Sequence, residues 1–135
     1  MDNISPEQRS EVMRRITKTD TKPELCVRKL CHSLGFRFRL HRADLPGTPD
    51  LVFPSRRKII FVHGCWWHRH HCRPGQREPK SRRDYWLPKL ARNVARDKAA
   101  RNELRELGWA VLTIWECETT DIARLTEKIE SFLYP

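Results

Sequence analysis

Two apolar stripes with helical spacing open the chain, and a helix-start signal precedes each of them. Ser5–Gln8, in which proline and then glutamine follow a serine, predicts a helix that runs to about Ile16. Thr21–Glu24 repeats this arrangement and predicts a second helix that stops at Gly35. The apolar stripe of this second helix consists of Leu25, Val27, Leu30, Cys31 and Leu34.

The hydrophobic pattern then changes to the period of two that is typical of strands. Residues 36–41, FRFRLH, alternate between apolar and basic and predict a half-buried strand. Residues 50–53 predict a second strand after the turn LPGTPD, and residues 54–57 turn the chain back. Residues 58–62, KIIFV, form an unbroken apolar run that is typical of a central strand buried on both faces.

The C-terminal half predicts a long helix, a strand and a last helix. The long helix covers about residues 85–107 and ends at Gly108, with Pro88 either in its first turn or at a kink. Residues 109–115 predict another buried strand, and residues 120–133 predict an amphipathic helix. The order of these elements indicates one α/β domain with a mixed sheet between helices.

The charge of the chain says more about function than its hydrophobicity does. The formal net charge is +10, and 33% of the residues are charged. A basic excess of this size favours a polyanionic partner, most often nucleic acid, although a basic surface can also serve solubility or a ribosomal or membrane contact. No apolar run reaches membrane-spanning length, and residues 1–20 are too charged for a secretory signal. We therefore expect a protein of the cytoplasm, bacterial or otherwise, with no membrane partner.

Five cysteines, odd in number and unevenly spaced, fit metal binding better than a disulfide framework in that compartment. Thiolate and imidazole together are the ligand set of structural zinc. The loop after residues 58–62 supplies cysteines and histidines, and Cys117 would join them because neighbouring parallel strands end at the same edge of a sheet. Buried free cysteines beside surface histidines are the alternative explanation. The predicted zinc ligands are Cys65, His70, Cys72 and Cys117, with His68 and His71 as alternatives to His70.

A proline–aspartate pair heads the second predicted strand, as it does in metal-dependent nucleases, although such a pair is most often only a turn. If the second and third strands form a hairpin, Asp50 lies beside Val62 and His63. In that layout the carboxylate binds Mg²⁺ and a second group handles the attacking water. The acidic residue and lysine of the PD-(D/E)xK pattern are replaced by Phe61 and His63. The main-chain carbonyl of Val62 could still bind the metal, and His63 and His68 could share the proton transfer.

Two further carboxylates each have a structural and a functional interpretation. Glu24 is explained by a capping box at the start of the second helix, or it orients a histidine or a metal-bound water. Asp97 lies on the inward stripe of the long helix, where it either pairs with Arg101 one turn later or turns toward a site in a supporting role. The ion pair is the prediction we favour. The stripe consists of Leu87, Leu90, Val94, Asp97, Arg101 and Leu104.

The tryptophans of the metal loop lie next to a run of basic residues. Trp66 and Trp67 cannot both point inward from a short loop tied to zinc, and Trp86 extends the same region. Flat rings beside arginines are typical of nucleic-acid surfaces, where they stack on bases or wedge between them. The alternative is that the tryptophans cap the core. The basic residues are Arg69, Arg73, Arg77, Lys80, Arg82 and Arg83.

Together these motifs resemble the very short patch repair endonucleases, bacterial enzymes that nick DNA at mismatches. The resemblance covers almost the whole chain, and HGCxWHxHxC joined to a downstream WEC is its most specific part. The matching segments are MRRITKTDTKPE, LPGTPDLVF, IIFVHGCWWHRHHC, YWLPKLARNVARD and LGWAVLTIWEC.

This resemblance implies a restriction-endonuclease-like fold with a structural zinc, and a DNA-contacting helix in residues 1–20 followed by a catalytic core in residues 21–135. It implies Mg²⁺-dependent hydrolysis of the phosphodiester on the 5′ side of the mispaired thymine in a T:G pair of double-stranded DNA. Such pairs arise when 5-methylcytosine deaminates. Nicking one strand needs only a monomer, and other mismatch-repair proteins are further candidate partners.

The resemblance also assigns roles to residues by motif. Asp50 and the Val62 carbonyl bind Mg²⁺, His63 and His68 are catalytic, and Glu24 assists them. The same four zinc ligands are implied. The implied DNA contacts are Trp66, Trp67 and Trp86 in the major groove and Met13 from the minor-groove side, to which the basic run adds Arg69, Arg82 and Arg83 on the phosphates.

Three positions depart from the family pattern. Val62 stands where threonine is familiar, which is harmless if only its carbonyl meets the metal. Trp66 replaces the more usual phenylalanine and enlarges the wedge. Arg69 interrupts a run that is often all histidine, which favours His70 as the zinc ligand and adds a phosphate contact.

Two rival functions remain at the level of sequence. One is a related nuclease that acts on foreign or modified DNA in defence. The other is a zinc-stabilised DNA-binding module without catalysis, against which the intact set of Asp50, His63 and His68 argues.

Overall fold

The computed structural model describes residues 20–134, so the predicted helix of residues 5–16, with Met13, lies outside the described residues. Three α-helices and four strands make up the described part. The helices are α2 (Lys22–Ser33), α3 (Arg83–Glu106) and α4 (Ile122–Leu133), and the strands are β1 (Arg39–Leu40), β2 (Leu51–Phe53), β3 (Lys58–His63) and β4 (Ala110–Trp115). Short 3-10 turns cover Pro54–Arg56, Pro74–Gln76 and Glu116–Thr120.

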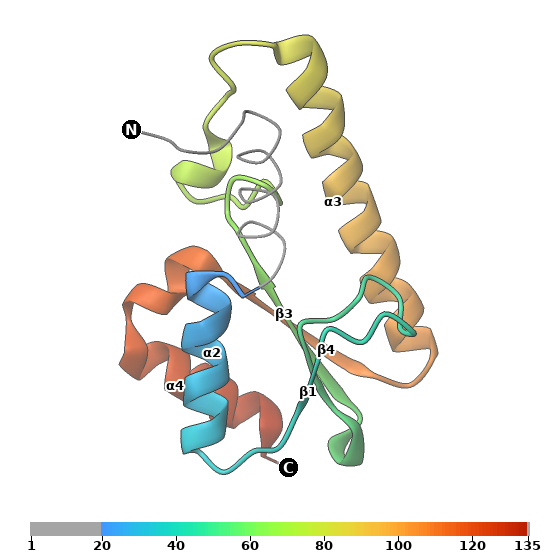
Figure 1. Cartoon of the computed structure of the whole chain (residues 1–135), viewed down its shortest axis with the longest axis vertical. Coiled ribbons are helices and arrows are strands. Elements are labelled where there is room, and N and C mark those ends of the chain that lie inside the picture. Colours follow the sequence, from blue (N-terminus) through green and yellow to red (C-terminus); the bar gives the residue numbers. More distant parts are fainter. Residues whose placement is uncertain (1–19, 135) are drawn as a thin grey trace, which may run out of the picture.

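The four strands form one mixed sheet in the order β1-β2-β3-β4. β2 and β3 are the expected antiparallel hairpin, in which Leu51 lies opposite Ile60. β3 and β4 run parallel, with His63 opposite Trp115, and α3 makes the crossover between them (Figure 1). The two parallel strands therefore end at the same edge of the sheet, as the sequence predicted for a shared zinc site.

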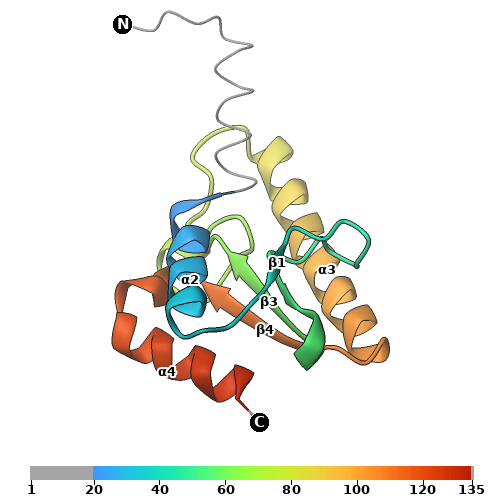
Figure 2. The same cartoon turned by 60° about the horizontal axis from the view of Figure 1, so that its bottom comes forward.

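Alternation along the strands builds two hydrophobic layers. Ile60 and Ile114 face α2 and α4 and join a core with Val27, Leu125 and others. Ile59 and Phe61 face α3 in a smaller core with Leu104, Trp109 and Val52. Figure 2 shows α2 and α4 on one side of the sheet and α3 on the other. The prediction of a mixed sheet between helices is confirmed.

The helix α2 begins as predicted, with Thr21 accepting a hydrogen bond from the Glu24 N–H at 3.4 Å. Its inward stripe is narrower than expected, because Leu25 is 43% exposed. In the same way Val94 is 42% exposed on α3, so its place on the inward stripe was wrong. Pro88 lies inside α3, past the first turn, on the solvent side, where water can bind the carbonyl that its missing N–H leaves open.

Two predicted element boundaries were too generous, and one strand is less buried than predicted. The strand expected over residues 36–41 contributes only two paired residues, because its partner β2 is short and His41 leaves the extended conformation with φ +45°. β4 lies at the sheet edge and is only half-buried, apart from Ile114. The last helix begins at Ile122, where Asp121 accepts the Arg124 N–H at 3.2 Å. No helix within residues 20–134 has both the length and the apolar character that a membrane crossing requires.

Candidate functional site

The residues with predicted chemistry meet where β3 and β4 end. β3 stops at His63 and β4 at Trp115, and the loop of residues 64–82 and the turn Glu116–Thr120 leave from these two points. The main chain thus delivers two separate segments of sequence to one place. Ligand crevices at the carboxyl ends of parallel strands are a general feature of α/β sheets.

Four of these side chains could hold a metal ion. Their ligand atoms all lie within 4.8 Å of one another: the Cys117 Sγ is 3.5 Å from the His70 Nδ1, and the Cys117 N–H donates to the Cys65 Sγ at 3.4 Å. A tetrahedral zinc with bonds of about 2.0 to 2.3 Å needs ligand atoms about 3.5 to 3.8 Å apart, so the donor set fits this metal. The group consists of the four predicted residues Cys65, His70, Cys72 and Cys117, and neither His68 nor His71 belongs to it.

The pKa values of these side chains also suit the binding of a cation. Burial raises the pKa of the Cys65 thiol to about 12, and burial likewise raises the pKa of Cys117. Burial lowers the pKa of His70, which keeps its imidazole neutral and able to bind a metal. Thiols in such surroundings ionise when a metal takes the place of their protons.

The metal loop is held from several sides. The Glu116 carboxylate accepts the Cys65 N–H at 3.4 Å, and the Trp115 ring stacks on His70 with centroids 4.3 Å apart. Gly75 is buried so closely against the loop that a β-carbon there would lie 2.1 Å from the His70 carbonyl oxygen. Only glycine fits at this point.

Asp50 lies beside β3, as the hairpin predicted. Its Oδ2 accepts the Val62 N–H at 2.7 Å. Burial raises the pKa of Asp50 to about 7; the negative charge of Glu24 adds to this rise, while the Val62 hydrogen bond and the charges of His41 and His68 oppose it. A half-buried carboxylate with a raised pKa at a strand end is a strong candidate for a metal ligand.

The Val62 carbonyl faces the same side as this carboxylate. In an antiparallel ladder the N–H and C=O of one residue point to the same neighbour, so the Val62 C=O points toward β2 as its N–H does. The hairpin register that pairs Leu51 with Ile60 would put Pro49 opposite Val62, and proline has no N–H to donate. The Val62 carbonyl therefore receives no main-chain hydrogen bond from that position and lies next to Asp50.

Two histidines stack beside the carboxylate. The His63 and His68 rings are 3.8 Å apart and nearly parallel, at 8°. The His68 Nδ1 lies 2.5 Å from the Asp97 Oδ2 of α3, so the predicted ion pair between Asp97 and Arg101 was wrong. Asp97 turns toward the site because the loop lays His68 over this part of α3, a contact between segments far apart in sequence. A hollow of about 430 Å³ opens here, lined by both histidines, Asp97 and Arg96.

The buried histidine differs from its neighbour. His63 is 5% exposed, and its Nδ1 has no hydrogen-bond partner among residues 20–134. Burial lowers the pKa of His63 to about 3, and the charges of His68 and Arg101 lower it further while Asp97 opposes them. His63 is therefore neutral at physiological pH, whereas His68 is oriented by a carboxylate.

Glu24 does not close the capping box that the sequence suggested. Its side chain is 2% exposed and contacts His41 and Arg28 instead. Neither of these two residues was predicted to belong to the site. The only hint in the sequence is that FRFRLH ends in a histidine where the strand pattern stops.

The tryptophans form a cluster of their own. Trp66, Trp67 and Trp86 are each half-buried, and their rings meet pairwise edge to face with centroids 5.0 to 5.6 Å apart. None of the three belongs to either hydrophobic core. The Trp67 carbonyl accepts a hydrogen bond from Asn93 of α3 at 3.1 Å, four residues before Asp97.

The basic segment after the metal loop is fastened to it. The Trp66 Nε1 donates to the Arg77 carbonyl at 2.9 Å, and the Arg69 Nη1 donates to the same oxygen at 2.7 Å. Arg69 also pairs with Glu78 at 2.9 Å. Arg82 and Arg83 remain exposed at the start of α3.

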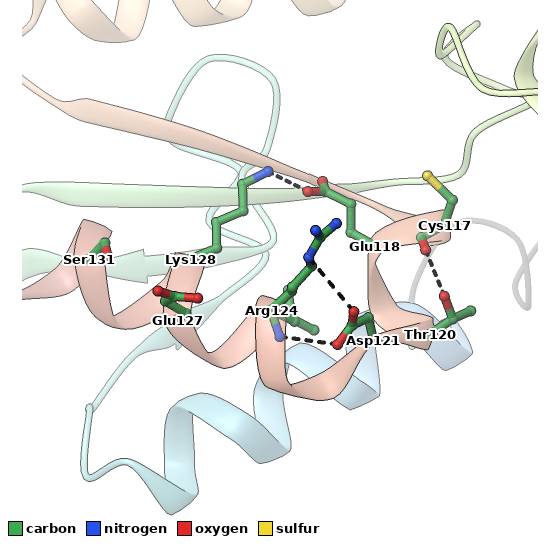
Figure 3. Close-up of a pocket in the computed structure, with 9 residues that line it drawn as sticks. Cys117, Glu118, Thr120, Asp121, Arg124, Glu127, Lys128 and Ser131 are labelled. Atoms are coloured by element: carbon green, nitrogen blue, oxygen red, sulfur yellow. Dashed lines mark hydrogen bonds and ion pairs between the residues drawn. The ribbon is translucent and has the colours of Figure 1, made fainter.

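A second hollow, of about 620 Å³, lies on the α4 side. Figure 3 shows Glu118 and Lys128 pointing toward each other there, and they pair at 2.5 Å. Arg124 and Asp121 form another pair at 3.9 Å. Cys117 is the only predicted site residue in its lining, so this hollow lies behind the metal cluster.

The sequence is similar to those of known DNA endonucleases. The family model described as DNA mismatch endonuclease Vsr matches residues 1–74. The chain is 52% identical over 134 residues to the type II nicking enzyme V.XorIIP of Xanthomonas oryzae pv. oryzae, covering 99% of this chain and 98% of that protein. It is 43% identical over 131 residues to the DNA mismatch endonuclease Vsr of Escherichia coli, covering 93% and 83%. It is 38% identical over 128 residues to the type II nicking enzyme V.NmeAIP of Neisseria meningitidis, covering 95% and 91%.

Proposed function

The chain belongs to the Vsr family of DNA mismatch endonucleases, and from this premise we propose that it nicks double-stranded DNA on the 5′ side of the mispaired thymine in a T:G pair. Its relatives support a DNA nicking endonuclease. The observation that carries the chemistry is the convergence of Asp50 and the His68–Asp97 pair at the end of β3. The enzyme would act as a monomer in the bacterial cytoplasm, in a restriction-endonuclease-like fold.

Asp50 and the Val62 carbonyl would hold the magnesium ion. Both are oxygen ligands, the type that this hard cation prefers, and both face one side of β3. A bound magnesium ion supplies positive charge to the attacking and leaving oxygens of the phosphodiester. Phe61 stands at the second acidic position of the common nuclease pattern, so the main chain replaces a side-chain ligand there.

The histidines divide the remaining work. Asp97 binds the Nδ1 of His68 and so fixes the tautomer that leaves its Nε2 as a base, which takes the proton of the attacking water. His63 stays neutral behind it and packs the ring in place. Because His63 also lines the hollow beside Asp97, its ring would steady the substrate phosphate or leaving oxygen. Glu24 assists from the other side of Asp50.

Zinc would fix the loop that carries His68 and the tryptophans. The four clustered ligands Cys65, His70, Cys72 and Cys117 connect the ends of β3 and β4, so the ion would tie the loop to the rigid sheet. The role we propose for this ion is structural. All four positions are protein side chains, which closes the coordination shell.

The aromatic cluster would open the base stack at the mismatch. Trp66, Trp67 and Trp86 present edge-to-face rings next to the histidine site, and a mismatched step costs least to unstack. Arg82 and Arg83 would bind phosphates nearby, while Arg69 holds the basic segment in place. Met13, outside the described residues, is proposed to approach from the minor groove.

A nicking assay tests the proposal. End-labelled duplexes with one T:G pair, or with the matched C:G pair, are incubated with Mg²⁺ and either the wild type or Asp50→Ala. We expect a nick beside the mispaired thymine that needs Mg²⁺ and is lost in the variant. Cleavage that ignores the mismatch would favour the defence nuclease, and binding without any nick would favour the non-catalytic module.

A further inference from the structure

We propose that His41 and Arg28 are positioning residues for the nicking reaction, because together they hold the Glu24 carboxylate beside Asp50. Neither residue was expected in the site from the sequence. The inference rests on the proposed function for its kinetic readout, but not for its metal-binding readout.

The first step is the burial of Glu24. Its side chain is 2% exposed, and a carboxylate so buried must be matched by donors or lose its charge. The Arg28 Nη2 donates to Glu24 Oε1 at 3.0 Å, and the His41 Nε2 contacts the same oxygen. Both donors come from outside the predicted site: Arg28 from the next turn of α2, and His41 from the end of β1.

The second step excludes a metal at this place. The ligand atoms of Asp20, Glu24 and His41 lie within 4.8 Å of one another, which is close enough to hold an ion. The guanidinium of Arg28 already fills that position, with its Nη2 2.6 Å from Asp20 and 3.3 Å from the His41 Nε2. The Arg28 guanidinium is therefore the cation of this group. It balances the negative charge of Glu24 from one side.

The third step connects this group to Asp50. The main-chain N–H of His41 donates to the Asp50 carbonyl at 3.2 Å, while its ring holds Glu24. His41 does so from a backbone with φ +45°, a left-handed conformation that only a few per cent of non-glycine residues adopt, histidine among the more frequent of them. One residue thus fixes the spacing between the two carboxylates.

The fourth step concerns the other oxygen of Glu24. The two donors share Oε1, and within residues 20–134 no donor contacts Oε2. Because the His41 main chain bonds Asp50 while its ring holds Glu24, the pair lies close to the predicted magnesium site. Held in this way, Glu24 keeps one oxygen available to the metal site or its water.

The test compares His41→Ala with His41→Gln and with His32→Ala. Glutamine keeps an N–H that can donate to Glu24, and His32 is an exposed histidine on the same helix as Glu24. Isothermal titration with Mn²⁺, in the absence of DNA, measures metal affinity, and single-turnover nicking measures the rate. We expect His41→Ala to weaken Mn²⁺ binding and to slow nicking by about tenfold or more, with an unchanged KM for the mismatched duplex. His41→Gln should recover most of both losses.

Equal metal affinity and equal rates in the wild type and His41→Ala would overturn the inference while leaving the nicking activity in place. Equal losses in the alanine and glutamine variants would also overturn it, because they would indicate a general packing role. If the wild type does not nick but His41→Ala still weakens Mn²⁺ binding, the proposed function fails and the positioning role stands. If His41→Ala does not fold, Arg28→Lys and His41→Gln carry the same comparison, with weaker Mn²⁺ binding expected for Arg28→Lys alone.

Discussion

At the scale of single residues, burial gives two stacked imidazoles different properties. His63 is enclosed and neutral, and its neighbour His68 is partly open to solvent with a carboxylate on one nitrogen. A protonated His63 would repel a protonated His68. The neutral form of His63 therefore lets His68 take up and release a proton without that repulsion. We therefore propose His68, rather than His63, as the base.

This assignment makes Asp97 the residue whose loss should be costly. Asp97→Asn keeps the shape of the side chain but removes the charge that stabilises the His68 imidazolium, and it lets the histidine adopt the wrong tautomer. We expect the single-turnover nicking rate to fall about 100-fold, within the usual range for general-base catalysis. Arg101→Gln is the matched control on α3. If both variants nick at the wild-type rate, Asp97 has no part in the chemistry.

The raised pKa of Asp50 should appear in the pH dependence of stability. The folded-state pKa of Asp50 is about 7, above its ordinary value of 3.8, so between these values the folded protein binds a proton that the unfolded chain does not. The free energy of unfolding then falls as the pH rises toward 7. Between about pH 6 and about pH 8, the magnesium-free wild type should lose about 1.4 kcal/mol that Asp50→Asn does not lose.

Urea unfolding of the zinc-loaded proteins at the two pH values measures this difference. Added Mg²⁺ should restore the wild type at the higher pH, because the metal binds the ionised carboxylate. His63 is present in both proteins and its contribution cancels. The same slope in both proteins would mean that Asp50 is ionised throughout this range.

At the scale of elements, the metal loop depends on the sheet for its position and on its own side chains for its shape. The four predicted zinc ligands connect the ends of β3 and β4, and Gly75 lets the chain pass close to the His70 carbonyl. The two hydrophobic cores contain none of the four ligands. The loop and the sheet should therefore respond differently to loss of the metal.

Cys117→Ser tests this separation. We expect the variant to lose bound zinc and nicking activity, and its Tm to fall by more than about 10 °C, since a structural zinc contributes several kcal/mol. The far-UV circular dichroism at low temperature should stay close to that of the wild type. Cys26→Ser, outside the cluster, should keep its zinc. Nicking by a zinc-free protein would show that the cluster is not needed to place His68.

Sequence pattern predicted those parts of the site that adjacent strands bring together. Asp50 meets Val62 because the turn at residues 54–57 closes a hairpin, and Cys65 meets Cys117 because β3 and β4 are parallel neighbours. Both contacts follow from strand order alone. The zinc ligand set and the central position of β3 were predictable for the same reason.

Contacts between a loop and a helix face were not predictable in this way. Asp97 had an apparent partner one turn away in Arg101, yet it binds His68, 29 residues earlier in the chain. The partnership of Glu24 with His41 spans 17 residues and depends on how α2 lies against the end of β1. No periodicity in the sequence encodes such packing. The strand boundary at residues 36–41 failed because pairing, not alternation, decides where a strand ends.

At the scale of the whole molecule, which has a net charge of +10, some basic side chains are paired with acidic ones and others are not. On the α4 side, Lys128 and Arg124 are matched with Glu118 and Asp121. At the start of α3, Arg83 pairs with Glu78 at 3.8 Å, but the exposed Arg82 and the half-buried Lys89 have no acidic partner among residues 20–134 and lie over the Tyr85 ring, the lysine also over Trp86. The end of the molecule that carries the tryptophan cluster is therefore the side we expect to face DNA.

The salt dependence of DNA binding tests this orientation. We expect Arg82→Gln to lower the slope of log K against log salt by about one unit, because one phosphate contact is lost. Arg124→Gln, 88% exposed on α4, should leave the slope unchanged. Fluorescence anisotropy with a labelled mismatched duplex gives both slopes. Equal changes in the two variants would mean that the basic charge acts as a diffuse field over the whole surface.

The pair of contacts that α3 makes with the metal loop has a consequence for timing. Asn93 holds the main chain at Trp67, and Asp97, one helical turn later, holds the side chain of His68. If Trp67 belongs to the wedge and His68 is the base, as proposed, α3 holds both at a separation that its helical pitch sets. A base step that resists opening would then displace α3 and draw His68 away from the phosphate. On this proposal, α3 would couple the opening of a weak base pair to the moment of cutting.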